Sequence, residues 1–292
     1  MSRPDRHGIL AGDRDSKECV MPIKSIVVHL ADDPRHLPRL RLAADLANRF
    51  DAHLNVVYAK ERVDMPAGIV GRGASMAFIA VAEETEREHA AATRKEVGDV
   101  CAGLRSWEWH EAQGEVDKVV AKWAHLSDLA IAEQSPQTHL EDKIIPHMAD
   151  HLVMLAGAPM LLVPDEWAGG SVGKQILVAW KNSREANGAV RSALPFLKQA
   201  DKVMILAHTP DPIADPPGSD VARYLGYHGI DAEIVGASAD GGNDILEVAT
   251  TQGSDLIVMG AYAKTMRLGE FIALGTTGAV MRNTTVPVLM RH

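Results

Sequence analysis

The sequence predicts an α/β protein made of two tandem, doubly wound halves, each with a five-stranded parallel sheet. The first observation is an internal repeat, because Ser127–Glu133 (SDLAIAE) recurs as Ser254–Gly260 (SDLIVMG). The second is that short, continuously apolar runs alternate with helical patterns, as expected when helices cover both faces of a sheet. The third is length, since 292 residues suffice for two domains of average size.

The first half is expected over residues 23–165, after a disordered lead-in over residues 1–22. Its tryptophans Trp107 and Trp109 alternate along one strand, so they face one side and are interpreted as core or interface residues. The elements that the pattern predicts are strand Ile23–His29, helix Ser75–Leu104, the tryptophan strand, helix Val116–Leu126, strand Ser127–Glu133 and strand Ala158–Val163.

The second half is expected over residues 174–292, after a glycine-rich linker over residues 166–173. Pro195 is expected to kink a helix or to begin its last part. The predicted elements are strand Gly173–Ala179, a proline-rich loop Pro210–Pro217, helix Ser219–Tyr227, helix Asn243–Thr251, strand Ser254–Gly260 and strand Val286–Met290. The last strand of each half would be a sheet edge, and the two edges are expected to pair within the chain or in a homodimer.

Composition excludes several function classes. The net charge of −9 and the aromatic content of 4% disfavour nucleic-acid binding. No apolar run reaches the roughly 18 residues that a membrane helix needs, and the first residues lack the apolar core of a secretory signal. Cys19 and Cys101 have no paired framework, so free thiols in a reducing cytoplasm are expected.

The stretch Asp255–Thr277 has the pattern of a strand, a glycine-containing loop and a helix N-terminus. Leu256–Met259 is apolar and ends at Gly260, and Gly275 later precedes two threonines. A helix N-terminus offers free N–H groups and the positive end of a dipole, which suit a phosphate. Parallel sheets bind ligands beyond the carboxyl ends of their strands, here at Trp180–Asn182 and Gly260–Tyr262.

These residues resemble the universal stress protein family in its tandem form, over about residues 23–291. The family motif is Gly-x2-Gly-x9-Gly-(Ser/Thr), for which the chain has Gly260 first and Gly275-Thr276 last. The opening segment Ile176–Ala186 is also similar to the family's first strand and turn. The resemblance implies Rossmann-like domains that dimerise, and many family members bind ATP.

Three features depart from the family motif. Ala263 stands at the second glycine, the spacing from there to Gly275 is two residues longer, and Lys181 replaces an aspartate that lies near the adenine. If ATP or a related nucleotide binds, the resemblance implies these contacts: Ala179, Trp180, Lys181, Gly260, Tyr262, Ala263, Lys264, Gly275, Thr276 and Thr277.

The first half departs further from the motif. Gln134–His139 contains no glycine, Leu30 is aligned with the aspartate position, and Glu133 places a negative charge where a phosphate would lie. We therefore expect no nucleotide in this half, which would be a structural partner of the second.

Other motifs have structural interpretations. Gly169–Lys174 resembles a phosphate-binding loop only superficially, since it precedes a strand, and Gly68–Gly73 is interpreted as a loop. His147 and His151 have the i, i+4 spacing of zinc ligands, and His29 at the end of a strand is a third candidate, but without further ligands no metal is predicted.

Several polar residues are expected at turns and helix caps. Ser183 and Thr276 are predicted first as helix N-caps and second as ligand contacts. Asp32 and Asp33 are predicted as turn or cap residues. Because the sequence contains neither a nucleophile elbow nor a paired acid and base at a recognisable site, no catalytic residue is predicted.

The leading hypothesis is a cytoplasmic binding and regulatory module of the stress response, with ATP or a related adenine nucleotide in the second half. One alternative is a scaffold that binds no nucleotide and acts by dimerisation or partner contact. A further alternative is a slow ATP hydrolase, which would lack an evident base and metal ligands.

Overall fold

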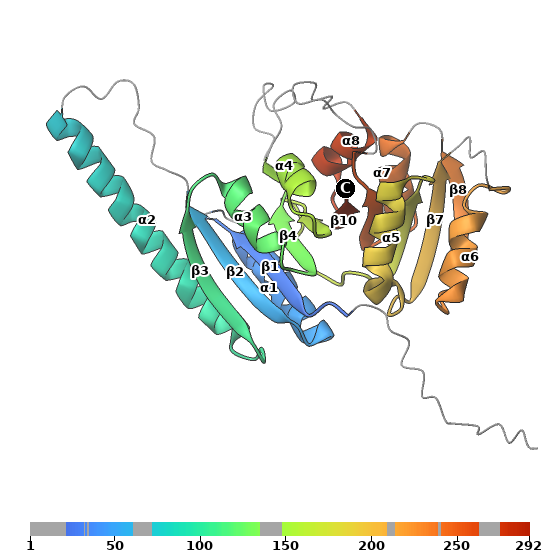
Figure 1. Ribbon diagram of the computed structural model, residues 1–292, viewed down its shortest axis with the longest axis horizontal. Helices are drawn as coiled ribbons and strands as arrows, with labels where there is room; N and C mark the ends of the chain where they lie inside the picture. Colours follow the sequence, from blue (N-terminus) through green and yellow to red (C-terminus); the bar gives the residue numbers. More distant parts are fainter. Residues whose placement is uncertain are drawn as a thin grey trace, which may run out of the picture.

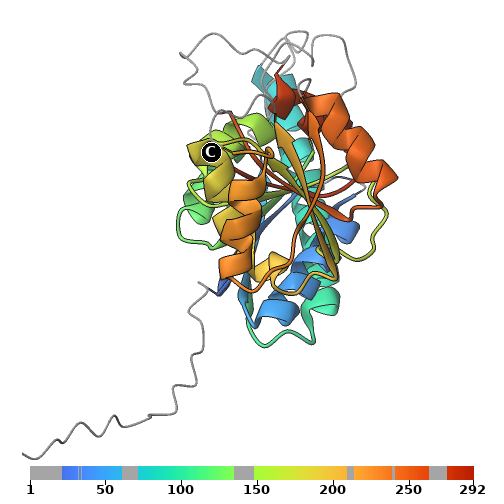
Figure 2. The ribbon, with the colours of Figure 1, turned by 90° about the vertical axis from the view of Figure 1, so that its right-hand side faces the viewer.

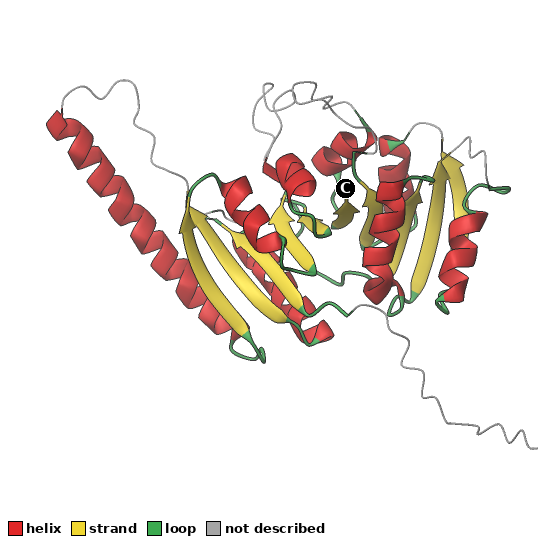
Figure 3. Ribbon diagram, viewed as in Figure 1, coloured by secondary structure: helices red, strands yellow, loops and turns green. Residues whose placement is uncertain are grey.

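The computed structural model describes residues 22–31, 33, 35–60, 72–134, 148–208, 214–238, 241–262 and 275–292. Strands and helices alternate along the whole described chain, and the strands form a single sheet between helices (Figure 3). Within the described residues, no helix combines the length and hydropathy needed to cross a bilayer.

The first half alternates strands and helices as predicted, with boundaries that differ by a few residues. Its elements are β1 (Ser25–Leu30), α1 (His36–Phe50), β2 (His53–Lys60), α2 (Arg72–Cys101), β3 (Trp107–Gln113), α3 (Val116–Ala124), β4 (Leu129–Glu133), α4 (Met148–Leu155) and β5 (Met160–Val163). Trp107 and Trp109 pack against the core, and the Trp109 ring stacks on Tyr58 with centroids 5.5 Å apart.

The second half repeats the same succession of elements. They are β6 (Gln175–Trp180), α5 (Arg184–Leu197), β7 (Lys202–His208), α6 (Ser219–Tyr227), β8 (Glu233–Ser238), α7 (Gly242–Thr251), β9 (Leu256–Gly260), α8 (Thr276–Asn283) and β10 (Val288–Arg291). Helix α6 has the predicted bounds, and α5 runs through Pro195 to its end.

The two halves share one ten-stranded sheet of order β3-β2-β1-β4-β5-β10-β9-β6-β7-β8 (Figure 1). Within each half the strands are parallel, which confirms the predicted tandem α/β fold. The halves meet through β5 and β10, which pair antiparallel, with Leu161 opposite Leu289. The edges that we expected to pair within the chain therefore do so.

Helices cover both faces of the sheet (Figures 1 and 2). Helices α1, α2, α5 and α6 pack on one face, where Val28, Leu54 and Phe196 are fully buried. Helices α3, α4, α7 and α8 pack on the other, where Leu152 and Val280 are fully buried. Burial of each such side chain contributes about 1.5–3 kcal/mol.

The aspartate of the repeated Ser-Asp pair lies at the amino edge of the sheet and has a structural role in both halves. The Asp128 carboxylate accepts the N–H groups of Lys24 and Ser25 at 2.8 and 3.0 Å. The Asp255 carboxylate accepts those of Lys174 and Gln175 at 3.0 and 2.9 Å. Each aspartate therefore fixes the start of the first strand of its half, which explains the repeat without a ligand.

Of the two predicted helix N-caps, one is confirmed and the other is wrong. Ser183 caps α5 as predicted, since its hydroxyl accepts the Ala186 N–H at 3.2 Å. The prediction for Thr276 was wrong: Gly275 is the N-cap of α8, and Thr276 is the first helical residue. Gly275 has the extended backbone of a cap residue, so the helix begins one position after it.

Candidate functional site

The candidate site lies at the carboxyl edge of the sheet, where the first and fourth strands of each half end. In the strand register Ile26 lies opposite Leu129, and Ile176 lies opposite Leu256, which are equivalent positions of the repeat. The counterpart of Lys181 is therefore Ala31. The alignment that placed Leu30 there was wrong by one residue, because the strand register makes Leu30 the counterpart of Trp180.

In the first half this edge is closed by a buried ionic network. The Arg39 side chain is 1% exposed; its Nε–H donates to the His29 carbonyl at 2.9 Å. Its Nη2 lies 2.6 Å from Asp33 Oδ2 and 3.3 Å from Glu133 Oε2. The His29 Nδ1 lies 3.1 Å from the same Glu133 oxygen. Asp33 is therefore more than the turn residue that we predicted, and Asp32 lies outside the described residues.

Charge holds this network in its ionised form. Burial alone would raise the pKa of Glu133, but the charges of His29 and Arg39 and the hydrogen bond from His29 lower it to about 2. Burial and the charge of Glu133 together raise the pKa of Asp165, which is nearby. An incoming phosphate would meet an ionised Glu133 carboxylate that already has its cations.

In the second half Gly260 stands where the first half has Glu133. A Cβ on Gly260 would lie 2.4 Å from the Ala186 nitrogen and 2.7 Å from the Glu185 carbonyl carbon. No side chain fits at those distances, because the obstructing atoms are backbone in the first turn of α5. Gly260 thus permits the close packing of β9 on α5, a structural reason that the motif alone does not reveal.

Tyr262 connects the end of β9 to α8 and to the first half. Its φ is +53°, a left-handed value uncommon for tyrosine. Its N–H donates to Thr277 Oγ1 at 3.2 Å, and its hydroxyl donates to the Asp150 carboxylate on α4. Burial and the neighbouring negative charge of Asp150 raise the pKa of Tyr262, so the hydroxyl keeps its proton.

The start of α8 is exposed at Gly275 and Thr276 and buried at Thr277. Gly275 is exposed, no described side chain caps the helix, and a Cβ there would have nothing within 4 Å. The Thr276 hydroxyl lies against Gly241, where a Cβ would be only 2.4 Å from Oγ1. Thr277 is 8% exposed. On α8, the exposed residues of the candidate site are therefore Gly275 and Thr276.

The residues predicted to contact a nucleotide lie on both faces of the sheet. Ala179 and Tyr262 pack with the α7–α8 side, whereas Trp180 belongs to the α5–α6 side. Lys181 is exposed at the carboxyl edge. Ala263 and Lys264 lie outside the described residues. The structure thus brings Tyr262 and Thr277 together and places Trp180 in a separate pocket.

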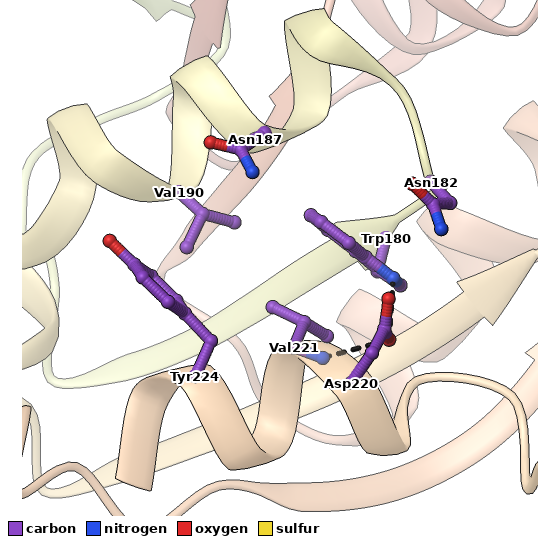
Figure 4. Close-up of a pocket in the computed structure, with 7 residues that line it drawn as sticks. All are labelled: Trp180, Asn182, Asn187, Val190, Asp220, Val221 and Tyr224. Carbon is purple, nitrogen blue, oxygen red and sulfur yellow. Dashed lines mark hydrogen bonds between the residues drawn. The ribbon is translucent and has the colours of Figure 1, made fainter. Parts of the chain in front are cut away.

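That pocket has a volume of about 160 Å³ (Figure 4). The Trp180 Nε1–H donates to Asp220 Oδ1 at 3.1 Å. It is lined by Trp180, Asn182, Asn187, Val190, Asp220, Val221 and Tyr224. Apart from Trp180 and Asn182, which lie at the strand end where a ligand was expected, none of these was singled out from the sequence. Only the proximity of the α5 and α6 patterns in adjacent βα units could have suggested them.

Two side chains join the halves beside the candidate site. The Gln134 amide donates from Nε2 to the Met281 carbonyl of α8 at 2.7 Å, and its Oε1 accepts the Asp165 N–H at 3.1 Å. The bond from Tyr262 to Asp150 runs in the opposite direction between the halves. The end of β4 therefore contacts α8, and the end of β9 contacts α4.

The histidines considered as metal ligands have other partners. His29 pairs with Glu133, and His151 Nδ1 lies 3.0 Å from Asp117 Oδ2, whereas His147 lies outside the described residues. In the part of the chain that the structure describes, no cluster of three His, Cys, Asp or Glu side chains is arranged to hold a metal. Cys101 is an unpaired thiol whose pKa is raised to about 11 by burial.

Comparison with solved structures identifies the fold. A universal stress protein from Archaeoglobus fulgidus DSM 4304 is 15% identical with a TM-score of 0.73, covering 91% of this chain and 95% of that one. A putative universal stress protein from Pseudomonas aeruginosa UCBPP-PA14 is 20% identical with a TM-score of 0.57, covering 92% and 93%.

A functionally unknown protein from Pseudomonas aeruginosa PAO1 is 19% identical with a TM-score of 0.58, covering 92% of each chain. No protein-family model and no curated protein sequence matches this chain. The chain therefore has the tandem α/β fold found in universal stress protein structures, over nearly its whole length.

Proposed function

We propose that the chain is a tandem universal stress protein, a cytoplasmic binding and regulatory module whose second half binds ATP or a related adenine nucleotide. Residues 23–165 and 174–292 would be its two domains, and residues 166–173 the linker. The shared fold supports the family assignment. The contrast between the carboxyl edges of the two halves supports the assignment of the ligand to the second half.

The observation that carries the proposal is the exchange of Glu133 for Gly260 at the same place in the repeat. In the first half, Glu133 and Arg39 fill the edge with paired charges. In the second half, the backbone at Gly260 carries no charge, and the exposed Lys181 lies at the end of the adjacent strand. An anionic ligand is therefore favoured in the second half and disfavoured in the first.

The groups that would hold the phosphates are the N–H groups at the start of α8. The first N–H groups of a helix have no intrahelical acceptor, and the positive end of the helix dipole attracts an anion. Gly275 leaves this end uncovered, because no described side chain caps it. The exposed Thr276 follows it directly, so its N–H is the natural first contact for a phosphate oxygen.

Replacing Gly275 by aspartate separates binding from folding. An added Cβ meets nothing within 4 Å, and the extended backbone at Gly275 suits an aspartate N-cap. We expect the free energy of unfolding to stay unchanged or to rise by a few tenths of a kcal/mol, while the affinity for ATP falls at least about tenfold by charge repulsion. Isothermal titration calorimetry and urea denaturation measure the two quantities.

The matched control is Gly103→Asp in the first half, which is also exposed with nothing within 4 Å of its Cβ. This variant should bind ATP as the unchanged protein does. Saturable ATP binding that persists in the Gly275→Asp variant would show that the phosphates are held elsewhere.

A scaffold that binds no nucleotide is the second candidate function. It is favoured by the structural use of two motif positions, because Gly260 packs on α5 and Tyr262 bonds to the first half. Since β5 and β10 already pair with each other, a homodimer of this scaffold would need a surface other than that edge. Absence of nucleotide from the gently purified protein, together with a flat ATP titration, would favour the scaffold.

A further inference from the structure

The pocket beside Trp180 lies away from the proposed phosphate site, on the opposite face of the sheet. It opens between α5 and α6, whereas Tyr262 and Thr277 pack on the α7–α8 side. Its volume of about 160 Å³ is close to that of a cavity of about 150 Å³ that binds benzene, so a compact organic group fits. Its lining side chains come from the end of β6, the loop after it and the two helices (Figure 4).

The pocket has a rigid apolar floor and two aromatic walls. Val190 and Val221 are 2% exposed and lie between the rings of Tyr224 and Trp180 (Figure 4). Trp180 is 7% exposed, and its ring is held by the hydrogen bond to Asp220. Such walls are in place before a ligand arrives, so little ordering is needed on binding.

The Tyr224 ring also has a neighbour on its own helix. It makes an edge contact with the His228 ring one helical turn later, with centroids 4.9 Å apart. Both rings therefore present a fixed π surface to whatever enters the pocket. The negative face of an aromatic ring attracts a cation that lies against it.

The lining carries one negative charge and no positive charge. Asp220 Oδ1 accepts both the Trp180 indole N–H at 3.1 Å and the Val221 N–H at 2.8 Å. Among the described residues no basic side chain pairs with this carboxylate, and Oδ2 accepts no hydrogen bond. The amides of Asn182 and Asn187 are exposed at the rim and have no hydrogen-bond partner in the described chain.

We propose that this pocket binds a small organic cation, a guanidinium or ammonium group on a short carbon chain. The Asp220 carboxylate would accept a charge-assisted hydrogen bond through Oδ2. The two rings would flank the cation, and the amide oxygens of Asn182 and Asn187 would accept its remaining N–H groups. The charge preference is opposite to that of the proposed phosphate site, so the two sites select different ligands.

The test compares two probes of the same shape that differ in charge, methylguanidinium and methylurea. In ¹H–¹⁵N spectra of the full chain, methylguanidinium should shift the Trp180 indole N–H saturably, with a dissociation constant on the order of 1 mM for so small a ligand. Methylurea should cause no saturable shift at the same concentrations. Equal responses to the two probes, or no response to either, would overturn the proposal.

The decisive variant is Asp220→Asn. The amide oxygen can still accept the two N–H groups that hold Trp180 and Val221, so the fold is kept and only the charge is removed. We expect methylguanidinium affinity to fall about tenfold or more. The matched control, Asp231→Asn, changes an exposed acid outside the pocket and should leave the affinity unchanged. Undiminished affinity in Asp220→Asn would contradict the assigned role of the carboxylate.

A second variant tests the aromatic wall separately from the charge. Tyr224→Leu keeps Asp220 and fills part of the same volume with an apolar side chain that has no π face. We expect a several-fold loss of methylguanidinium affinity. If Tyr224→Leu binds methylguanidinium as tightly as the unchanged protein does, the rings only form the walls of the pocket. That result would remove the aromatic part of the proposal.

Discussion

Replacing Gly260 by alanine is expected to lower the free energy of unfolding by about 3 kcal/mol, at the upper end of overpacking costs. The new Cβ would lie 2.4 Å from the Ala186 nitrogen. That atom is backbone at the start of α5, so relief requires β9 or the whole helix to move. Urea denaturation followed by circular dichroism measures the change.

Gly98→Ala is the matched control for this prediction. Gly98 lies inside α2, and an added Cβ meets nothing within 4 Å. Because alanine is the better helix former, this variant should gain about 0.5–1 kcal/mol. A loss below about 0.5 kcal/mol in Gly260→Ala would mean that the approach of β9 to α5 is looser than the geometry indicates.

Replacing Glu133 by glutamine is expected to cost about 3 kcal/mol of unfolding free energy at neutral pH. The substitution preserves shape but removes the charge that pairs with His29 and Arg39. Arg39 is buried and, among the residues that the structure describes, keeps only Asp33 as a carboxylate partner within salt-bridge distance. A buried cation that loses part of its pairing is the source of the loss.

The direction of the Glu133 pKa shift determines how the stability loss in Glu133→Gln depends on pH. The pKa of Glu133 is lowered from 4.5 to about 2 in the folded chain. A carboxyl group whose pKa falls on folding contributes stability above its unfolded pKa and loses it as the pH falls toward the folded value. The stability difference between the unchanged protein and Glu133→Gln should therefore be largest at neutral pH and shrink between about pH 4.5 and 2.

Glu84→Gln is the matched control for the stability measurements on Glu133→Gln. Glu84 pairs with Arg87 on the exposed face of α2, with both side chains more than half exposed. Its removal should change stability by less than about 0.5 kcal/mol at any pH. If Glu133→Gln showed the same flat, small difference as Glu84→Gln, the closed edge of the first half would not be held by charge.

The order of strands and helices could be predicted because the chain repeats it. Ser127–Glu133 and Ser254–Gly260 end as β4 and β9, at equivalent places in the sheet. Apolar runs and turn residues act locally, so the predicted bounds of α6 agree with the structure. The antiparallel pairing of β5 and β10 was expected only as one of two ways to cover an edge. An apolar strand sequence does not show which strand it pairs with.

The polar residues were harder to interpret, because their partners come from distant positions. Arg39 lies in an amphipathic helix, where a basic residue is expected to face solvent. Its burial depends on Glu133 and His29, which reach it from two different strands. Spacing in one segment cannot reveal such a network, and the same holds for Asp220 beneath Trp180.

The glycines illustrate a different limit. Gly260 and Gly275 were assigned together as parts of a phosphate motif. In the structure, Gly260 has a steric reason to be glycine, whereas a Cβ at Gly275 would meet nothing. The same motif therefore contains one glycine that packing requires, Gly260, and one that folding does not require, Gly275. The unconstrained Gly275 is the better candidate for a functional role.

In the proposed function, the second half of the chain binds a nucleotide and the first half does not. The most direct test is the stoichiometry of ATP binding to the full chain, measured by isothermal titration calorimetry and checked by native mass spectrometry. We expect saturation at one ATP per chain. Two ATP molecules per chain would contradict the closed edge at Glu133 and Arg39, and none would contradict the open edge at Gly275.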